Sequence, residues 1–175
     1  MRLIFVRHGQ TDANIRELQG EGVAECDPPL NAVGVTQSES VAEKLKDEKV
    51  DAIFTSPLLR AKQTAEIINR FHNVPLIEIP ALRERNTGTL TGDAYRDLFD
   101  FDKNVRQPEI EPIKEYSNRI YGAIDAIKSY GYENVIVVSH GGVHHAFRAY
   151  CEGLEWAGNI RVDRVGNCDY RVYEI

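Results

Sequence analysis

The amino-acid sequence predicts an α/β fold: a three-layer sandwich in which helices flank a mostly parallel central sheet. Short strand-like segments alternate along the chain with longer segments that have helical periodicity. Two of the strand-like segments, residues 51–55 (DAIFT) and 134–139 (NVIVVS), are apolar without alternation. Such segments are typical of strands that helices cover on both faces, as in a parallel sheet.

Three further segments complete the predicted sheet, at residues 2–6, 75–79 and 170–175. The last of them, YRVYEI, is a candidate for an edge strand. Because exposed strand edges pair with one another in dimers, the sequence is compatible with a monomer or a homodimer.

Helical periodicity predicts four helices, over residues 35–47, 58–71, 113–130 and 142–152. The third carries Ile120, Ile124 and Ile127 on one apolar stripe. Ser56 and Pro57 precede the second helix, and they predict its start, since Ser is a good N-cap and Pro is tolerated at the first helical position.

The length of 175 residues suits one domain, which we expect to span residues 1–175. Residues 91–111 have no regular periodicity, and we expect them to form an insertion or lid over one edge of the sheet. This segment is acidic, with six carboxylates against three basic side chains: Asp93, Asp97, Asp100, Asp102, Glu109 and Glu111 against Arg96, Lys103 and Arg106.

Charge and composition exclude several classes of protein. The net charge of −6 argues against nonspecific binding to nucleic acid or to an anionic membrane surface. No apolar run approaches the ~20 residues of a membrane span, and no signal-peptide pattern is present, so we expect a cytoplasmic protein. The widely spaced Cys26, Cys151 and Cys168 contain no CxxC pair, which predicts neither a disulfide framework nor a zinc site.

Charged and polar side chains follow four of the predicted strands, at the point where each strand ends. Arg7 and His8 follow the first strand, and Arg60 lies in the first turn of the helix after the second. Glu84 follows the third strand, and His140 the fourth. Because ligands of open α/β sheets bind beyond the carboxyl ends of the strands, we expect these five side chains to meet at one site.

This combination of side chains indicates phosphoryl transfer. Arginine presents a planar fork of donors that matches phosphate oxygens, and helix N-termini add backbone N–H groups. We expect Gly9, Gly141 and Gly142 to let the backbone approach the ligand closely. An imidazole that is neutral near pH 7 can serve as the nucleophile, and Glu84 could protonate the leaving oxygen.

Three weaker candidates each have a plainer interpretation. Asn14 is either a donor to a phosphate oxygen or an ordinary loop residue. Thr11 either lines the mouth of the site or caps a helix. His144 lies one helical turn after His140, and a packed or exposed helix residue is a better interpretation of it than a place in the site.

Four segments, FVRHGQT, SPLLRAKQTA, ALRERNTGTLTG and VVSHGG, resemble in this order the motifs of the histidine phosphatase superfamily, also called the phosphoglycerate mutase-like family. The resemblance covers most of the chain and implies a phosphoglycerate mutase-like fold. It also implies that His8 becomes phosphorylated and that Glu84 is the proton donor and then the base for water. The implied phosphate ligands are Arg7, Asn14, Arg60 and His140, with Thr11 and Gly141 as further candidates. The family uses no metal ion, so the resemblance implies no cofactor.

The sequence departs from the mutases of this family in two places. Mutases usually carry a Tyr shortly after the acid, where this chain has Arg85, Asn86 and Thr87. Their insertion is longer and basic, whereas an acidic lid would repel a doubly anionic sugar acid. Many members also have an Arg two positions after the VVSHGGV segment, where this chain has His144 and His145.

We therefore predict a phosphomonoester hydrolase with a phosphohistidine intermediate, acting on a small phosphorylated substrate. A cofactor-dependent phosphoglycerate mutase and a non-catalytic sensor of a phosphate ligand are the alternatives. A metal-dependent hydrolase built on His8, His140 and His144 is disfavoured, because Arg7 and Arg60 would lie beside the metal ion. The sequence does not name the substrate, and sugar phosphates, nucleotides, phosphoglycerates and phosphoproteins all remain open.

Overall fold

A five-stranded sheet forms the middle layer of the computed structural model, which describes residues 1–18, 27–86, 110–154 and 165–175. Its strands are β1 (Arg2–Arg7), β2 (Ala52–Thr55), β3 (Leu76–Glu78), β4 (Asn134–Ser139) and β5 (Tyr170–Glu174), in the order β3-β2-β4-β1-β5. The first four strands are parallel, and β5 is antiparallel to β1. The predicted mostly parallel sheet is confirmed, and the last strand does lie at an edge.

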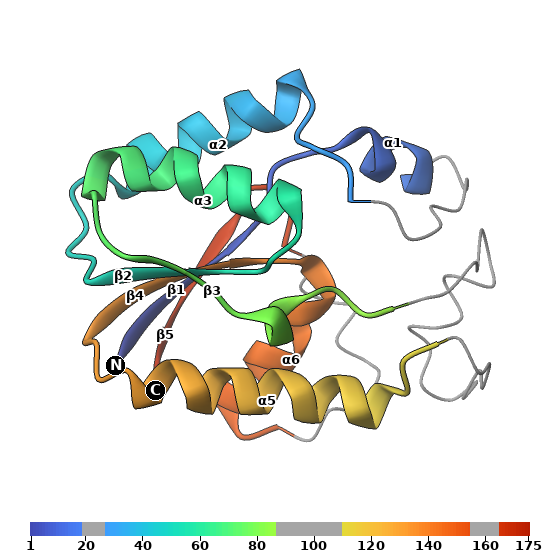
Figure 1. Cartoon of the computed structure of the whole chain (residues 1–175), viewed down its shortest axis with the longest axis vertical. Helices are drawn as coiled ribbons and strands as arrows, with labels where there is room; N and C mark the ends of the chain where they lie inside the picture. The colour runs from blue at the N-terminus through green and yellow to red at the C-terminus, as the bar shows by residue number, and fades with distance from the viewer. Residues whose placement is uncertain (19–26, 87–109, 155–164) are drawn as a thin grey trace.

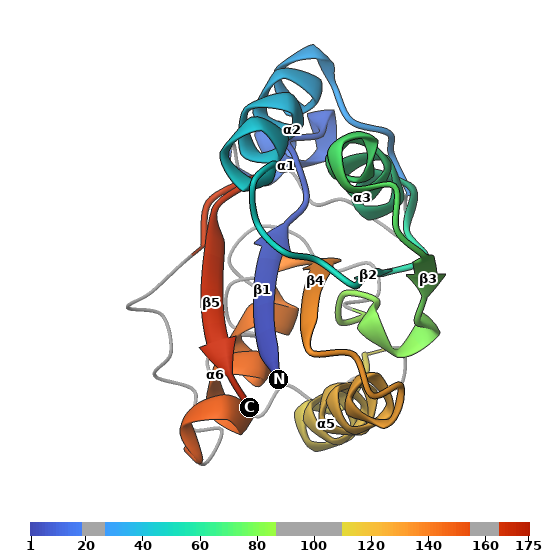
Figure 2. The same cartoon turned by 90° about the vertical axis from the view of Figure 1, so that its left-hand side faces the viewer.

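Helices cover both faces of this sheet. They are α1 (Asp12–Leu18), α2 (Ala32–Leu45), α3 (Leu59–His72), α5 (Ile113–Ser129) and α6 (Gly141–Glu152), with a 3₁₀ turn, η1, at Pro80–Leu82. Figure 1 shows α2 and α3 above the sheet and α5 and α6 below it. The view along the sheet in Figure 2 separates the same three layers, which confirms the predicted sandwich.

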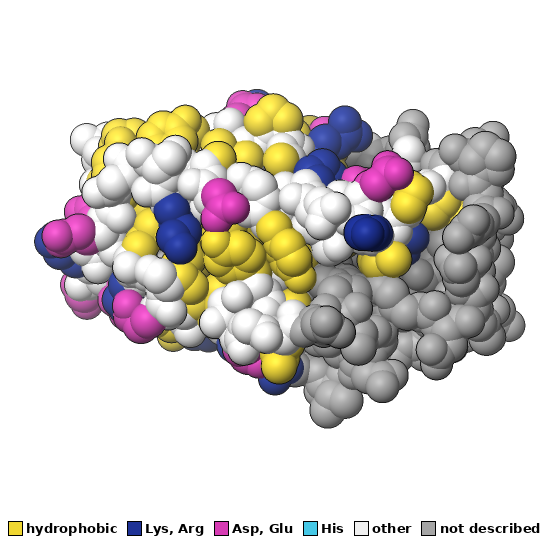
Figure 3. Space-filling view, turned by 90° about the horizontal axis from the view of Figure 1, so that it is seen from below, with side chains coloured by type: hydrophobic (Ala, Val, Ile, Leu, Met, Phe, Trp, Pro, Cys, Tyr) yellow, Lys and Arg dark blue, Asp and Glu magenta, His cyan; other side chains and the backbone are white. Residues whose placement is uncertain are grey.

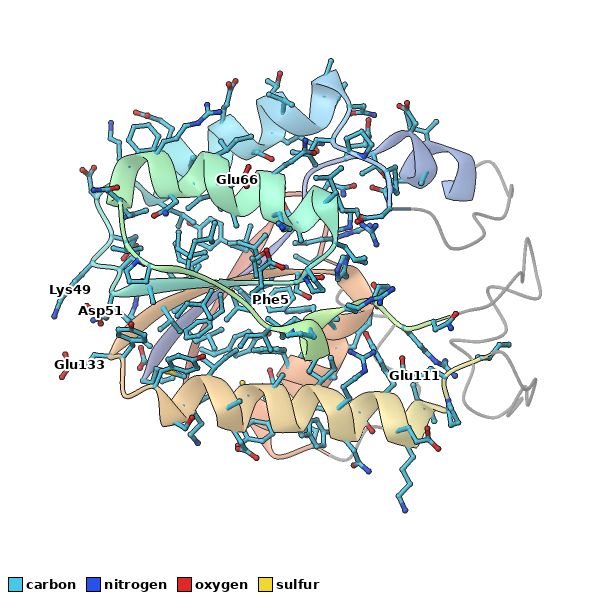
Figure 4. The ribbon with its side chains drawn as sticks, in the orientation of Figure 1. Phe5, Lys49, Asp51, Glu66, Glu111 and Glu133 are labelled. Atoms are coloured by element: carbon cyan, nitrogen blue, oxygen red, sulfur yellow. The ribbon has the colours of Figure 1, made fainter. Side chains whose placement is uncertain are left out.

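The central strands bury side chains on both faces, which explains their unbroken apolar sequence. In β1, Leu3 and Phe5 pack in one core cluster with α5 and α6. Ile4 and Val6 point the other way, into a second cluster with α2 and α3. All four side chains are at most 1% exposed. Figure 4 shows Phe5 between the sheet and the lower helices.

Two helix starts differ from the prediction. Helix α2 begins at Ala32, three residues before the expected Val35, because the Asn31 side chain caps it by accepting a hydrogen bond from Gly34 N at 2.9 Å. Ser56 does not cap α3, whose N-cap is Leu58. Asp27 Oδ1 instead accepts a hydrogen bond from Leu59 N at 2.7 Å. The prediction for Ser56 was wrong because its hydroxyl bonds to His140 Nε2.

Helix α1 was not predicted, since its sequence was interpreted as a polar loop. Thr11 and Asn14 hold its first turn by a reciprocal pair of hydrogen bonds. Asn14 N donates to Thr11 Oγ1 at 3.3 Å, and Thr11 N donates to Asn14 Oδ1 at 3.1 Å. This is the arrangement of a capping box, with Asn in the position that Glu or Gln usually takes.

The amino edge of the sheet carries the chain ends and the loops opposite the predicted site. The Met1 ammonium group donates to Ile175 O at 2.6 Å, and Ile175 N donates to Met1 O at 3.0 Å. In Figure 4 the labelled Lys49, Asp51 and Glu133 lie together at this end of the molecule. The face that Figure 3 shows from below mixes apolar side chains with single charged ones and forms no basic stripe among the described residues.

Several expectations fall on segments that the structure does not describe. The expected lid at residues 91–111 lies outside the described residues except for Ile110 and Glu111. Cys26 lies outside them as well, whereas Cys151 and Cys168 are free thiols. Burial raises the pKa of each of these two thiols to about 11, so both are protonated near neutral pH. No helix within the described ranges is long and apolar enough to cross a membrane.

Candidate active site

The carboxyl ends of β1 and β4 bring two buried histidines together. His8 follows β1 and is 3% exposed, and His140 follows β4 and is 0% exposed. Their ring centroids are 5.1 Å apart, with an angle of 61° between the planes. The backbone fixes this arrangement, because His8 N donates to Ser139 O at 2.9 Å and so extends the β1–β4 pairing by one residue.

The hydrogen bonds of His8 define which of its ring nitrogens carries the proton. Nδ1 lies 2.7 Å from Gly9 O, and a carbonyl oxygen only accepts, so Nδ1 is the donor. Arg60 Nε donates to Nε2 at 3.2 Å, so Nε2 presents its lone pair. His8 is therefore a neutral imidazole whose Nε2 carries the free lone pair.

The electrostatic surroundings keep both histidines neutral. Burial, followed by the charges of Arg60 and Arg7, lowers the pKa of His8 well below its ordinary 6.5, and the Gly9 hydrogen bond opposes this only in part. Burial also lowers the pKa of His140 well below 6.5, with His8, Arg60 and Arg7 as further causes. Near pH 7 the positive charge of the site therefore resides on the arginines.

Two nitrogen atoms near His8 are buried and have no hydrogen-bond partner among the described residues: His140 Nδ1 and Arg7 Nε. His140 Nε2 is occupied, at 2.8 Å from Ser56 Oγ. Arg7 Nη1 donates to Val165 O at 2.8 Å. A Cβ on Gly141 would lie 3.5 Å from Arg7 Nε, so the start of α6 lies against this guanidinium. Buried donors without partners are costly, and an anion would satisfy them.

Glu84 faces the start of α6 and is held by three donors. Oε1 accepts from Tyr116 Oη at 2.8 Å and from Arg85 N at 3.0 Å. Oε2 accepts from Gly142 N at 3.0 Å. A Cβ on Gly142 would lie 3.1 Å from Glu84 Cδ, so the glycine makes room for the carboxyl group. A glycine is required at position 142 because any larger side chain would overlap the carboxyl group of Glu84.

Gly9 likewise serves a contact within the chain. A Cβ at this position would lie 2.5 Å from Gly34 O and 2.8 Å from Ser38 Oγ. The loop after β1 therefore passes directly over the backbone of α2. Gly9 is therefore required for this packing, and its approach to a ligand stays a prediction.

Thr11 and Asn14 lie next to His8 but chiefly cap α1, as the plainer interpretation of Thr11 had it. Asn167, which the sequence analysis missed, connects this turn with the site. Its Nδ2 donates to His8 O at 2.9 Å and to Asn14 Oδ1 at 3.3 Å. Asn14 Oδ1 is thus occupied by donors, so any contact with a phosphate oxygen would come from its NH₂ group.

His144 packs inside the fold, as expected. Its Nε2 lies 2.7 Å from Tyr173 Oη, and its ring centroid lies 5.1 Å from that of Phe5. The described residues contain no group of three His, Cys, Asp or Glu side chains that could hold a metal ion. The arrangement His8, His140 and His144 is therefore not a ligand set in this structure.

Two more residues near the site escaped the sequence analysis in their actual roles. Ser56 was interpreted as a helix cap, although it orients His140. Tyr116 is on the buried face of α5 with Ile120, and this periodicity indicates a core residue but not a partner for Glu84. Helical spacing could have found its burial, and no pattern in the sequence could have found its hydrogen bond.

The chain is similar to several known proteins. The sequence pattern of the Histidine phosphatase superfamily (branch 1) matches residues 3–175. The uncharacterized phosphatase PhoE of Bacillus subtilis is 36% identical over 150 residues, which are 85% of this chain and 76% of that protein. A metal-independent phosphoserine phosphatase of Arabidopsis thaliana is 35% identical over 174 residues, 90% of this chain and 71% of that one.

Among solved structures, the alpha-ribazole phosphatase of Shigella flexneri superimposes with a TM-score of 0.82 at 27% identity, over 100% of this chain and 91% of that chain. The pattern match over nearly the whole chain, together with the buried histidine pair at the carboxyl edge of the sheet, assigns the chain to the histidine phosphatase superfamily.

Proposed function

We propose that the protein hydrolyses phosphomonoesters without a metal ion, through a phosphohistidine formed on His8 Nε2. One observation carries the proposal: a buried, neutral imidazole presents its lone pair beside two arginines. The resemblance to a metal-independent phosphoserine phosphatase supports it. The arginines already supply the positive charge that a metal ion would bring to a phosphoryl group.

In the first step His8 Nε2 attacks the phosphorus atom, and the bond from phosphorus to the ester oxygen breaks. Arg60 leaves its hydrogen bond with Nε2 and binds a phosphoryl oxygen. Arg7 and His140 Nδ1–H donate to the other oxygens, which develop charge during the transfer. His8 Nδ1 keeps its proton and its bond to Gly9 O, so the imidazole stays oriented throughout.

The leaving oxygen takes a proton from Glu84. Oε2 is suited to carry this proton, because it accepts one hydrogen bond from the described residues whereas Oε1 accepts two. In the second step a water molecule attacks phosphorus, the bond to Nε2 breaks, and Glu84 takes a proton from the water. Inorganic phosphate leaves, and both His8 and Glu84 return to their starting protonation states.

His140 would contribute as the Nδ1–H tautomer. Ser56 Oγ accepts a hydrogen bond from Leu58 N at 3.3 Å and, in this tautomer, its hydroxyl proton bonds to His140 Nε2. Nε2 then accepts, and the single proton of the neutral ring is on Nδ1, the unpartnered atom. The two histidines thus differ in function: one has its lone pair in the site and the other its N–H.

The experiment is a panel of phosphomonoesters that includes phosphoserine and 3-phosphoglycerate, assayed with EDTA present. We expect phosphate release that EDTA does not reduce, and a base-stable, acid-labile phosphate on His8 after rapid quenching. His8→Ala should abolish both signals, whereas His72→Gln, at the end of α3, should keep them. Turnover without phosphate on His8, or turnover lost with EDTA, would contradict the proposal. Isomerisation of 3-phosphoglycerate that needs a bisphosphoglycerate primer would identify a mutase. If no ester in the panel is turned over, a non-catalytic sensor would be favoured.

A further inference from the structure

We propose that Tyr116 is a positioning residue that directs the proton of Glu84 onto Oε2, the oxygen that accepts a hydrogen bond from Gly142 N. The inference rests on the proposed function, because it concerns the acid of that reaction. Tyr116 lies on α5, 32 residues from Glu84, and its hydroxyl donates to Oε1 at 2.8 Å.

Tyr116 is a permanent donor. Its side chain is 1% exposed, and burial, followed by the charge of Glu84, raises its pKa well above the ordinary 10.0. The phenol therefore keeps its proton at every pH at which the enzyme works. Because Glu84 Oε1 accepts from this phenol and from Arg85 N, a proton on Oε1 would compete with two fixed donors.

Oε2 lacks this competition. It accepts one bond among the described residues, from Gly142 N at 3.0 Å, and Gly142 is at the start of the helix that also lies against Arg7. The proton of the acid is thereby placed on the oxygen that contacts Gly142 N, at the start of α6. The hydrogen bond of Tyr116 determines which oxygen is the donor without touching the reacting atoms itself.

The tyrosine ring is held firmly enough to orient a carboxyl group. The Arg119 guanidinium lies 5.0 Å from the ring centroid of Tyr116. Arg119 also forms an ion pair with Glu111, with Nε 2.7 Å from Oε1 and Nη2 2.7 Å from Oε2. Arg119 Nη1 donates to Arg83 O at 3.0 Å, one residue before the acid.

Arg119 in α5 and Glu111, two residues before α5, therefore clamp the loop that carries Glu84 from two sides. Arg85 Nε donates to Glu111 O at 2.8 Å, and Glu111 N donates to Asn86 O at 3.0 Å. Figure 4 shows the labelled Glu111 at the beginning of α5, at the edge of the molecule opposite Lys49 and Asp51. One of the six carboxylates of the acidic segment thus has a structural partner and serves this clamp.

The test compares Tyr116→Phe with Tyr150→Phe. Both variants remove one phenol hydroxyl that donates to a carboxylate, since Tyr150 donates to Asp125, away from the site. The probes are phosphoserine, an alkyl ester with a poor leaving group, and p-nitrophenyl phosphate, which needs no proton. We expect Tyr116→Phe to lower kcat on phosphoserine by about tenfold or more with little change in KM, and to change kcat on p-nitrophenyl phosphate by less than about threefold. Tyr150→Phe should leave both rates unchanged.

A double-mutant cycle with Glu84→Gln completes the test. In the Glu84→Gln background, Tyr116→Phe should cause no further loss on phosphoserine, because the acid is already absent. The inference would be overturned if the losses in kcat of Tyr116→Phe and Glu84→Gln multiplied in the double variant. It would also be overturned if Tyr116→Phe lost kcat equally on both esters, or lost none.

Thermal unfolding checks that the variants fold. If Tyr116→Phe unfolds, Arg119→Lys, which loosens the clamp but keeps the phenol, must show the same selective loss on phosphoserine. If wild-type protein turns over neither ester, the proposed function itself has failed. A wild-type enzyme that turns over both esters while the variants lack this selectivity would refute the positioning role alone.

Discussion

His8 and His140 are both buried and neutral, yet their ring nitrogens have different neighbours. Gly9 O accepts the Nδ1 proton of His8, and Ser56 Oγ lies against Nε2 of His140. In the proposed reaction, this pair of identical side chains provides one nucleophile and one donor. The difference comes from a carbonyl oxygen and a hydroxyl group, each in contact with one ring nitrogen.

Arg60 has two effects on the nucleophile that can be separated by pH. Its charge is the second cause, after burial, of the low pKa of His8. A protonated His8 cannot attack phosphorus, so wild-type kcat/KM should hold well below pH 6.5 and fall only in stronger acid. Arg60→Gln removes one lowering influence, so it should reduce the rate and also shift the acid limb of the profile toward higher pH.

The matched control is Lys62→Gln. Lys62 is on the same helix but forms an ion pair with Glu78, 2.6 Å away. The acid limb of the Lys62→Gln profile should coincide with that of the wild type when kcat/KM is measured across the same pH range. An acid limb that does not move in Arg60→Gln would show that burial alone sets the pKa of His8.

Three of the proposed site residues could be predicted to meet because each lies at the end of an apolar strand or directly after it. Arg7, His8 and His140 need only the rule that parallel strands end at one edge. The residues that orient them could not be predicted. Ser56 meets His140 across 84 residues, and Asn167 meets His8 across 159. Contacts of this range depend on the packed fold and leave no local pattern.

At the scale of elements, the strands were easier to predict than the helix starts. Burial on both faces makes a strand visible as an unbroken apolar run, as in β2 and β4. A helix start depends on which side chain reaches the first N–H groups. At the start of α3, the side chain of Asp27, 32 residues earlier in the sequence, accepts the hydrogen bond from Leu59 N. Ser56 is therefore not needed as the cap of α3.

The close approach of the β1 loop to α2 predicts opposite effects for two helical glycines. A Cβ on Gly34 would overlap the backbone of Gln10, at 2.8 Å from its N atom, whereas a Cβ on Gly122 in α5 would meet nothing within 4 Å. Gly34→Ala should therefore lower the free energy of unfolding by about 1–3 kcal/mol and reduce turnover, because the displaced loop carries His8. Gly122→Ala should raise the free energy of unfolding by about 0.5–1 kcal/mol, since alanine favours the helix.

Urea denaturation and turnover of p-nitrophenyl phosphate would measure both effects. Equal stabilisation by the two substitutions would show that the β1 loop can move away from α2 at little cost. In that case the packing of Gly9 against Gly34 would not determine the position of His8.

For the molecule as a whole, the buried histidines link stability to pH. His8 and His140 bind a proton in the unfolded chain near their ordinary pKa of 6.5 but resist it when folded. Where the unfolded chain binds more protons, stability rises with pH. The free energy of unfolding should therefore fall as the pH drops below 6.5, by up to about 1.4 kcal/mol per pH unit for each histidine.

Urea titrations between about pH 7 and about pH 5 would measure this slope, above the range in which most carboxylates titrate. His8→Gln should make the slope shallower, because it removes one such histidine. His72→Gln should change the slope less, since the pKa of His72 is lowered by a burial that is only partial. A flat profile in the wild type would contradict the neutral, buried state of the pair.

The hydrogen bonds between Met1 and Ile175 make the backbone almost a closed ring. The two chain ends, the seam of that ring, lie together at the amino edge of the sheet, as Figures 1 and 2 show. His8 and His140 follow the carboxyl ends of β1 and β4, at the opposite edge. A short peptide bridge could seal the seam, and new ends could be opened in the exposed turn near Lys49 on the same edge. A tag or partner domain attached at either position would lie on the side of the sheet opposite His8 and His140. The amino edge of the sheet is therefore a suitable place for attachment.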